Sequence, residues 1–185
     1  MENIPGGELA LVMSGGGARA AYQVGVLRAL ARDWPDVSFP ILTGVSSGAI
    51  NAAFLAAHTG EFPERVEELG RLWSNLAVDQ VFRVDALSLA RNALRLGLKL
   101  VSGGAVTAPR AHALVDTSPL RELLVGALGA VDSRIPGIER NLERGALRAA
   151  AITASSYSTG QSITWVQGRD IQLWQRPQRK SVACE

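Results

Sequence analysis

The sequence predicts an α/β fold, a three-layer sandwich with a mainly parallel central sheet. The first observation is an order that occurs twice, at residues 8–33 and 41–58: a short apolar run, a glycine-containing turn and a helical pattern. The second is that both turns follow the carboxyl ends of strands, where open α/β sheets bind ligands. The third is a length of 185 residues, 47% of them hydrophobic, which suits one domain with its own core.

The N-terminal elements follow from local patterns. Residues 8–13 form an apolar run ended by glycines and predict a buried strand. Residues 19–33 predict a helix, and residues 34–40 a loop with two prolines. Residues 41–45 predict a second buried strand, and residues 48–58 a second helix. The first helix places four small or apolar side chains on one face: Ala20, Val24, Leu27 and Ala31.

The later elements are a mixture of helices and strands. A surface helix with early acidic residues is expected at 62–76, and an apolar helix at 86–101. Another helix begins within 116–128, with Ser118 as a candidate N-cap and Pro119 at its first position. A buried strand is expected at 146–157. The segments 161–167 and 171–176 flank a Gly-Arg-Asp turn and predict a hairpin.

Composition excludes several classes of protein. The net charge of +2 does not indicate a nucleic-acid partner. Cys184 is the single cysteine, so an internal disulfide is impossible. The N-terminus lacks the pattern of a signal peptide, and no apolar stretch reaches the roughly 18 residues of a membrane span. A cytoplasmic protein without cofactor or metal is expected.

Residues 44–48 match the pattern G-x-S-x-G, with Ser46 at its centre. A nucleophilic serine at the top of a sheet needs a sharp strand-to-helix turn, and glycines at 44 and 48 remove side chains that would clash there. The N-terminus of the following helix favours developing negative charge. The alternative is a structural turn in which the serine is an ordinary N-cap.

The glycine run Gly15-Gly16-Gly17 also follows a strand and opens a helix. Its bare backbone N–H groups suit an oxyanion hole for a carbonyl attacked by Ser46. Residues 15–20 also fit the looser dinucleotide fingerprint G-x-G-x-x-A, although Asp36, the acidic residue at suitable spacing, precedes the second strand. A tight turn without function is the third interpretation.

The stretches SGGGARAAYQVGVLRAL and TGVSSGAINAAFLA resemble the patatin-like phospholipases, which carry G-G-G-x-R in the first turn and G-x-S-x-G in the second. LVDTSPLRELL and, more weakly, AAITASSYSTGQSITW extend the resemblance. It implies a patatin-like fold with Ser46 as the nucleophile. It also implies an oxyanion hole at Gly15, Gly16 and Gly17, with Arg19 shaping that loop. One departure is Ala20, where many members have glycine.

The partner of the serine does not emerge from the sequence. Of the two histidines, His58 lies about 15 Å along the second helix from Ser46, and His112 has no catalytic context. The resemblance implies a Ser-Asp dyad whose aspartate precedes glycine. No aspartate here does so: Asp33, Asp36, Asp79, Asp85, Asp116, Asp132 and Asp170. We therefore expect residues 1–185 to be one patatin-like domain truncated before its catalytic aspartate, and inactive alone.

Residues 86–101 carry a basic stripe, Arg91, Arg95 and Lys99, surrounded by leucines. A basic amphipathic helix suits peripheral contact with the inner face of a membrane. The alternative, which the pattern favours, is a helix packed on the sheet or over the site as a lid.

These observations lead to a serine lipid acyl hydrolase acting on phospholipid or lysophospholipid. The alternatives are a nucleotide-binding protein of the Rossmann type, or an inactive interaction module with the patatin fold.

Overall fold

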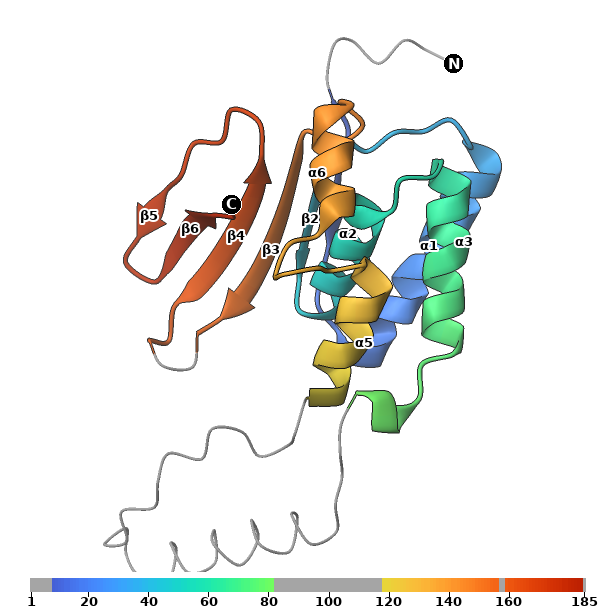
Figure 1. Cartoon of the computed structure of the whole chain (residues 1–185), viewed down its shortest axis with the longest axis horizontal. Coiled ribbons are helices and arrows are strands. Elements are labelled where there is room, and N and C mark those ends of the chain that lie inside the picture. The colour runs from blue at the N-terminus through green and yellow to red at the C-terminus, as the bar shows by residue number, and fades with distance from the viewer. Residues whose placement is uncertain (1–7, 82–117, 157–158, 185) are drawn as a thin grey trace, which may run out of the picture. The chain divides into compact units, whose positions relative to one another are not determined.

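The computed structural model describes residues 8–81, 118–156 and 159–184. It divides into two compact units, residues 1–75 with 126–185, and residues 76–125. The first unit holds a six-stranded sheet in the order β1-β2-β3-β4-β6-β5 (Figure 1). The strands are Ala10–Met13, Ile41–Val45, Ala149–Ser155, Ser162–Gly168, Gln175–Arg176 and Arg179–Ala183, numbered β1 to β6 in chain order. The predicted α/β fold with a mainly parallel sheet is confirmed.

Three parallel strands, β1, β2 and β3, position the candidate site. Met13 pairs with Gly44, and Gly44 with Ile152, so these strands end at one edge of the sheet. The residues after β1 and β2 therefore meet at that edge, as expected for parallel strands that share a direction.

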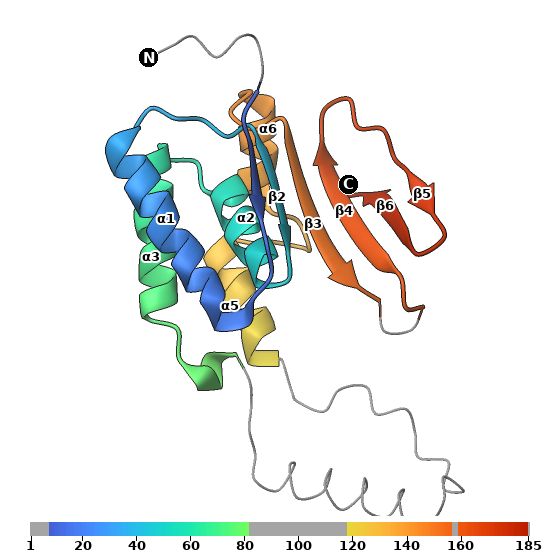
Figure 2. The same ribbon diagram turned by 180° about the vertical axis from the view of Figure 1, so that it is seen from behind.

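Helices of the first unit lie on one face of the sheet (Figures 1 and 2). Helix α2 (Ser47–Ala57) packs on β1, β2 and β3, and α1 (Ala20–Asp33) packs on α3 (Phe62–Ser74). Helix α6 (Pro136–Glu143) packs against α2. The core between sheet and helices includes Met13, Leu27, Leu42, Leu55, Leu69 and Leu147.

The opposite face of the sheet is open within the described residues. Val12 remains 74% exposed and Val45 41% exposed, whereas Met13 and Leu42, which alternate with them along the strands, are buried. The period-two pattern of burial thus assigns the helices to one face.

In the N-terminal half of the chain, the elements predicted from the sequence agree closely with those of the structure. Strand β2 and the end of α1 fall at the predicted residues, and α1 buries the predicted face of Ala20, Val24, Leu27 and Ala31. Helix α3 begins with a capping box formed by Glu61 and Glu64. Helix α5 (Ser118–Leu128) and strand β3 also lie within their predicted segments.

The predicted hairpin between 161–167 and 171–176 is wrong. Strand β4 pairs with β3 and, in parallel, with β6, while the short β5 forms a hairpin with β6. Trp174 lies outside the strands and exchanges hydrogen bonds with Ser181. Strand β4 therefore pairs with residues later in the chain than the predicted partner. The turn residues between 167 and 171 could not predict this pairing.

Helix α6 was not predicted from the sequence. Its first turn contains Pro136, and Gly145 follows its end with φ 78. Both are ordinary boundary signals, but a helix of 8 residues carries little periodicity.

The second unit is described only in part. It contains the 3-10 helix η2 (Val78–Gln80) and the first residues of α5. The predicted helix at 86–101 lies outside the described residues.

Candidate active site

Ser46 occupies the tight turn between β2 and α2. Its backbone has φ 55 and ψ −129, a conformation that L-residues rarely adopt and that costs about 1–3 kcal/mol. Its residue surface is exposed, and its hydroxyl makes no capping hydrogen bond to α2. Ser46 therefore occupies the N-cap position of α2 without the side-chain hydrogen bond of an ordinary cap.

The two flanking glycines permit the turn, as the sequence predicted. A Cβ on Gly44 would lie 2.3 Å from the carbonyl oxygen of Gly48. A Cβ on Gly48 would lie 2.4 Å from the carbonyl oxygen of Ser14. Both obstacles are backbone atoms that cannot move aside cheaply, so only glycine fits at either position.

The glycine run after β1 lies directly beside Ser46. A Cβ on Gly15 would lie 2.9 Å from Cβ of Ser46 and 3.6 Å from its Oγ. Gly17 has φ 59 and begins the 3-10 helix η1 (Gly17–Arg19). The structure thus brings together the two glycine-containing turns that the sequence singled out.

Two backbone hydrogen bonds hold the glycine loop in place, one from Gly16 and one from Arg19. The backbone N–H of Gly16 donates to Oγ of Ser47 at 3.1 Å, which ties the loop to the start of α2. The backbone N–H of Arg19 donates to the carbonyl oxygen of Gly16 at 3.2 Å and closes the turn. Ser47, almost wholly buried, was not identified from the sequence, because a second serine in G-x-S-x-G carries no signal of its own.

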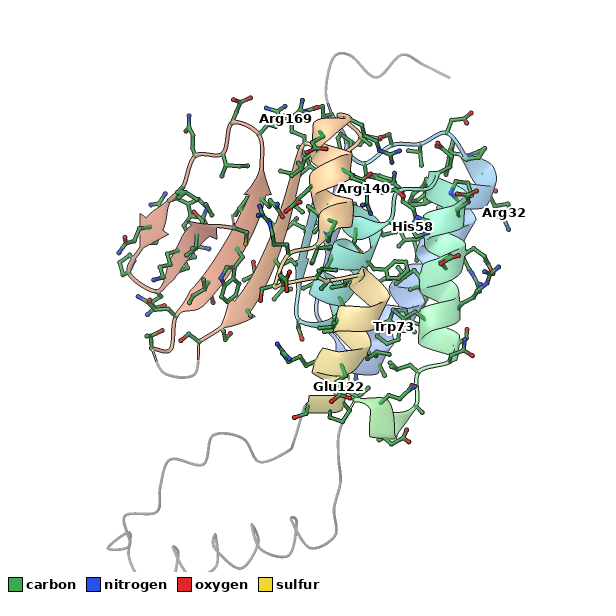
Figure 3. The ribbon with its side chains drawn as sticks, viewed as in Figure 1. Arg32, His58, Trp73, Glu122, Arg140 and Arg169 are labelled. Carbon is green, nitrogen blue, oxygen red and sulfur yellow. The ribbon has the colours of Figure 1, made fainter. Side chains whose placement is uncertain are left out.

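The candidate base His58 lies far from Ser46. His58 follows the C-terminus of α2, where it accepts the backbone N–H of Gly60 and lies 3.9 Å from a Glu68 carboxylate oxygen. Figure 3 shows His58 and Trp73 toward opposite ends of α3. Helix α2 contributes about 16 Å between Ser46 and His58 by its rise alone.

Three of the five described aspartates, Asp33, Asp36 and Asp170, also lie away from Ser46. Asp33 is the last residue of α1, a helix that begins beside the glycine run and leads away from it. Asp36 lies in the loop before β2, and Asp170 follows the end of β4 that pairs with Ala149 at the start of β3. All three lie at the edge opposite Ser46. Three other predicted candidates, His112, Asp85 and Asp116, lie outside the described residues.

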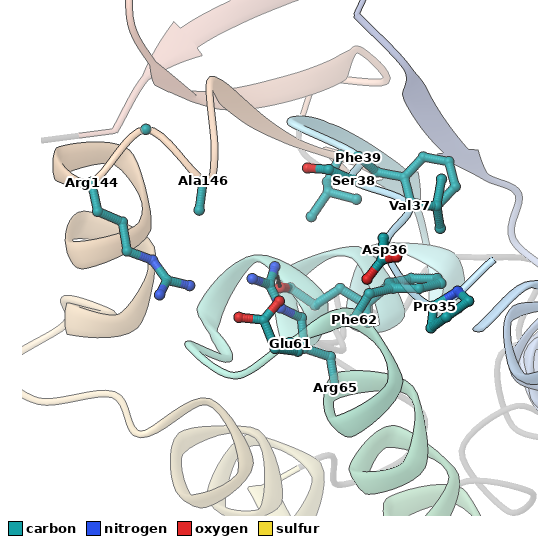
Figure 4. Close-up of a pocket in the computed structure, with 13 residues that line it drawn as sticks. Pro35, Asp36, Val37, Ser38, Phe39, Glu61, Phe62, Arg65, Arg144 and Ala146 are labelled. Atoms are coloured by element: carbon teal, nitrogen blue, oxygen red, sulfur yellow. Dashed lines mark hydrogen bonds between the residues drawn. The ribbon is translucent and has the colours of Figure 1, made fainter. Parts of the chain in front are cut away.

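A cavity of about 390 Å³ also lies at the opposite edge (Figure 4). Its lining comes from residues 35–39, the start of α3 and residues 144–146, and includes Arg65 and Arg144. Arg65 donates to the carbonyl oxygens of Gly60 and Leu55 at the end of α2. Burial lowers the pKa of the Arg65 guanidinium, and the charge of Arg144 adds to this effect. The cavity lies at the amino ends of β2 and β3, whereas Ser46 follows the carboxyl end of β2, so the two sites are separate.

Within residues 8–81, 118–156 and 159–184, no three His, Cys, Asp or Glu side chains form a group suited to a metal ion. None of the helices in these segments combines the length and apolar character that crossing a membrane requires.

Comparison with known proteins gives one match. No curated protein and no solved structure matches the chain. The family model described as Patatin-like phospholipase matches residues 11–134, a range that includes the glycine run and the turn at Ser46. The chain belongs to the family of patatin-like phospholipases.

Proposed function

We propose that the chain is a serine lipid acyl hydrolase of the phospholipase A or lysophospholipase type, with Ser46 as its nucleophile. The observation that carries the proposal is the exposed Ser46, held at φ 55 beside Gly15 and without a capping hydrogen bond. Backbone strain of this kind persists where the surrounding structure enforces it, and it is concentrated at functional sites. Family membership supports a lipid ester as the substrate class.

The proposed reaction has two steps. Oγ of Ser46 attacks the carbonyl carbon of the ester, the bond to the lipid alcohol breaks, and the alcohol leaves with a proton. Water then cleaves the acyl–Oγ bond, releases the carboxylic acid and restores the serine. Backbone N–H groups of Gly15 and Gly17 would stabilise the negative charge on the carbonyl oxygen, with Arg19 shaping the loop. The N–H of Gly16 is already donated to Ser47 and joins the loop to α2.

Four titratable side chains lie too far from Ser46 to act as its general base. His58, Asp33, Asp36 and Asp170 lie at the other edge of the sheet, so none of them can take the proton from Oγ. Resemblance to the family implies an aspartate in this role. Its position beyond Glu185 stays a prediction, as does membrane contact through residues 86–101.

The nucleotide-binding alternative receives less support. In the dinucleotide-binding order the first strand is central, whereas β1 is an edge strand of the described sheet. The residue that follows β2 is Ser46 rather than an acidic side chain for a ribose. The inactive-module alternative differs only in activity, so an experiment must decide it.

Labelling with a fluorophosphonate tests the nucleophile directly, because the reagent forms a covalent bond to an activated serine. The 185-residue chain and a chain extended past Glu185 are compared, each with Ser46→Ala as the control. Labelling that depends on Ser46 supports the hydrolase. Phosphatidylcholine vesicles and lysophosphatidylcholine micelles, with release of fatty acid as the readout, then distinguish the two lipid classes.

Each labelling outcome has a separate meaning. Labelling of the longer chain alone supports a base beyond Glu185, whereas labelling of both chains places an activating group within residues 1–185. No labelling of either folded chain contradicts the proposal and favours the inactive module.

A further inference from the structure

A chain of side-chain hydrogen bonds connects three helices to the glycine loop. Indole Nε1 of Trp73 in α3 donates to Oδ1 of Asn51 in α2 at 2.7 Å. Nδ2 of Asn51 donates to Oε1 of Gln23 in α1 at 3.1 Å, and to the carbonyl oxygen of Ala20 at 3.2 Å. Nε2 of Gln23 donates to the carbonyl oxygen of Ser14 at 2.7 Å. The series therefore ends on the residue that precedes Gly15.

The direction of every hydrogen bond in this series is determined by its first member. A tryptophan indole can only donate, so the amide oxygen of Asn51 must face Trp73. The amide nitrogen of Asn51 then faces Gln23, whose own oxygen must accept and whose nitrogen must point to Ser14. The last acceptor is the carbonyl oxygen of Ser14, which can only accept, so every donor in the series faces an acceptor.

Asn51 is the least exposed member of the series. Its relative exposure is 0%, and all the fully buried side-chain nitrogen and oxygen atoms of the described segments have hydrogen-bond partners. A buried amide that rotated would leave a donor facing the indole N–H, at a cost of about 1–3 kcal/mol. Burial therefore holds the amide of Asn51, and through it that of Gln23, in one orientation.

The Ser14 carbonyl and the Gly15 N–H belong to the same peptide group. A peptide bond is planar and trans, so its C=O and N–H point in opposite directions. When Gln23 holds the Ser14 oxygen toward α1, the Gly15 N–H points away from α1. Gly15 itself lies against Ser46, since a Cβ there would be 3.6 Å from Oγ.

We infer that Gln23 is a positioning residue, which fixes the Ser14–Gly15 peptide and so aims the Gly15 N–H at the carbonyl oxygen of the ester. Asn51 and Trp73 act through Gln23 by fixing the direction of its amide. The role toward the ester rests on the hydrolase function proposed above. Gly16 cannot replace Gly15 without losing its own hydrogen bond, because its N–H is donated to Ser47.

Two substitutions at Gln23 separate its donor from its acceptor. Gln23→Glu keeps an oxygen for Asn51 but offers no N–H to Ser14, and Gln23→Met keeps only the approximate length. Trp73→Phe removes the donor that sets the direction of the series, at a distance from the glycine loop. Gly25→Ala, on the exposed side of the same helix with nothing within 4 Å, is the matched control.

The first readout is the backbone order of Gly15, measured by ¹⁵N relaxation on the 185-residue chain. We expect an order parameter of about 0.85 in the wild type and in Gly25→Ala, falling toward 0.6 in both Gln23 variants. A smaller decrease is expected in Trp73→Phe. An unchanged value in both Gln23 variants, in chains that remain folded, overturns the positioning role.

The second readout is the rate of fluorophosphonate labelling in the chain that labels. Loss of one oxyanion donor costs about 10²–10³-fold, so misdirection of Gly15 should slow labelling by about tenfold or more. Ester hydrolysis should show the decrease in kcat, with KM unchanged. A normal labelling rate in Gln23→Glu overturns the inference. Absence of wild-type labelling would instead contradict the hydrolase function, while the order parameter of Gly15 still decides whether Gln23 fixes the loop.

Discussion

The hydroxyl of Ser47 accepts the backbone N–H of Gly16 at 3.1 Å, joining the glycine loop to the helix that follows Ser46. The two segments are 31 residues apart in sequence. One hydrogen bond therefore joins the loop proposed to stabilise the oxyanion to the residue that follows the proposed nucleophile, and Ser47 is almost wholly buried at this junction.

Ser47→Ala should loosen this junction. We expect the free energy of unfolding to fall by about 1 kcal/mol, because Gly16 loses its acceptor in a partly buried place. Denaturant titration measures the change. Ser38→Ala, at an exposed serine in the loop before β2, should change it by less than about 0.5 kcal/mol. Equal effects of the two substitutions would show that the Gly16–Ser47 hydrogen bond contributes nothing.

Two substitutions at Ser46 separate strain from chemistry. Ser46→Gly relieves φ 55, while Ser46→Ala keeps the strain and removes only the hydroxyl. We expect the glycine variant to be about 1 kcal/mol more stable than the alanine variant, because relief of strain exceeds the entropy that glycine loses on folding. Neither should react with a fluorophosphonate. A less stable glycine variant would argue against strain at this turn.

Gly48→Ala should disrupt the site, since its Cβ would lie 2.4 Å from one backbone oxygen and 2.5 Å from another. The expected loss of stability is about 3 kcal/mol or more, because neither β1 nor the residue after it can withdraw easily. Gly25→Ala is the control and should stabilise by about 0.5–1 kcal/mol, as an exposed helical glycine in open space. Thermal unfolding of both variants measures the contrast, and a tolerated alanine at 48 would contradict the described turn.

Asn141 supports the other end of α2. Its Nδ2 donates to the carbonyl oxygens of Ala56 at 2.7 Å and His58 at 3.0 Å, and the residue is completely buried. Asn141→Ala leaves both oxygens without this donor, and we expect a loss of about 2–4 kcal/mol in the free energy of unfolding. Asn75→Ala, at an exposed position after α3, should be nearly neutral. A similar small effect at 141 would refute the capping role.

The single thiol provides a pH-dependent test. Cys184 is exposed, but partial desolvation raises the pKa of its thiol above the ordinary value of 9.0. Because ionisation is then harder in the folded state, this contribution to stability is complete below pH 9.0 and is lost as the pH rises through the folded-state pKa. Alkylation by iodoacetamide at pH 8 should be slower in the native chain than in denaturant. Equal rates would contradict the raised pKa of the thiol.

Local patterns in the sequence determined the first half of the fold. The spacing of Ala20, Val24, Leu27 and Ala31 follows the helical period, and the structure buries these four residues of α1. The pattern around Ser46 also predicted its own turn, because the need for glycine at 44 and 48 is steric and local. The family match covers residues 11–134, a range that includes both glycine-containing segments.

Only the tertiary structure decided which distant groups meet. Strand β4 pairs with β6 rather than with the segment that follows it, since strand partners are chosen by packing and hydrogen bonding across the whole sheet. The contacts of Gly16 with Ser47 and of Gln23 with Ser14 depend on how α1 and α2 lie against the sheet. A sequence pattern records the preferences of neighbours along the chain, whereas these hydrogen bonds join groups that only the packing of the helices brings together.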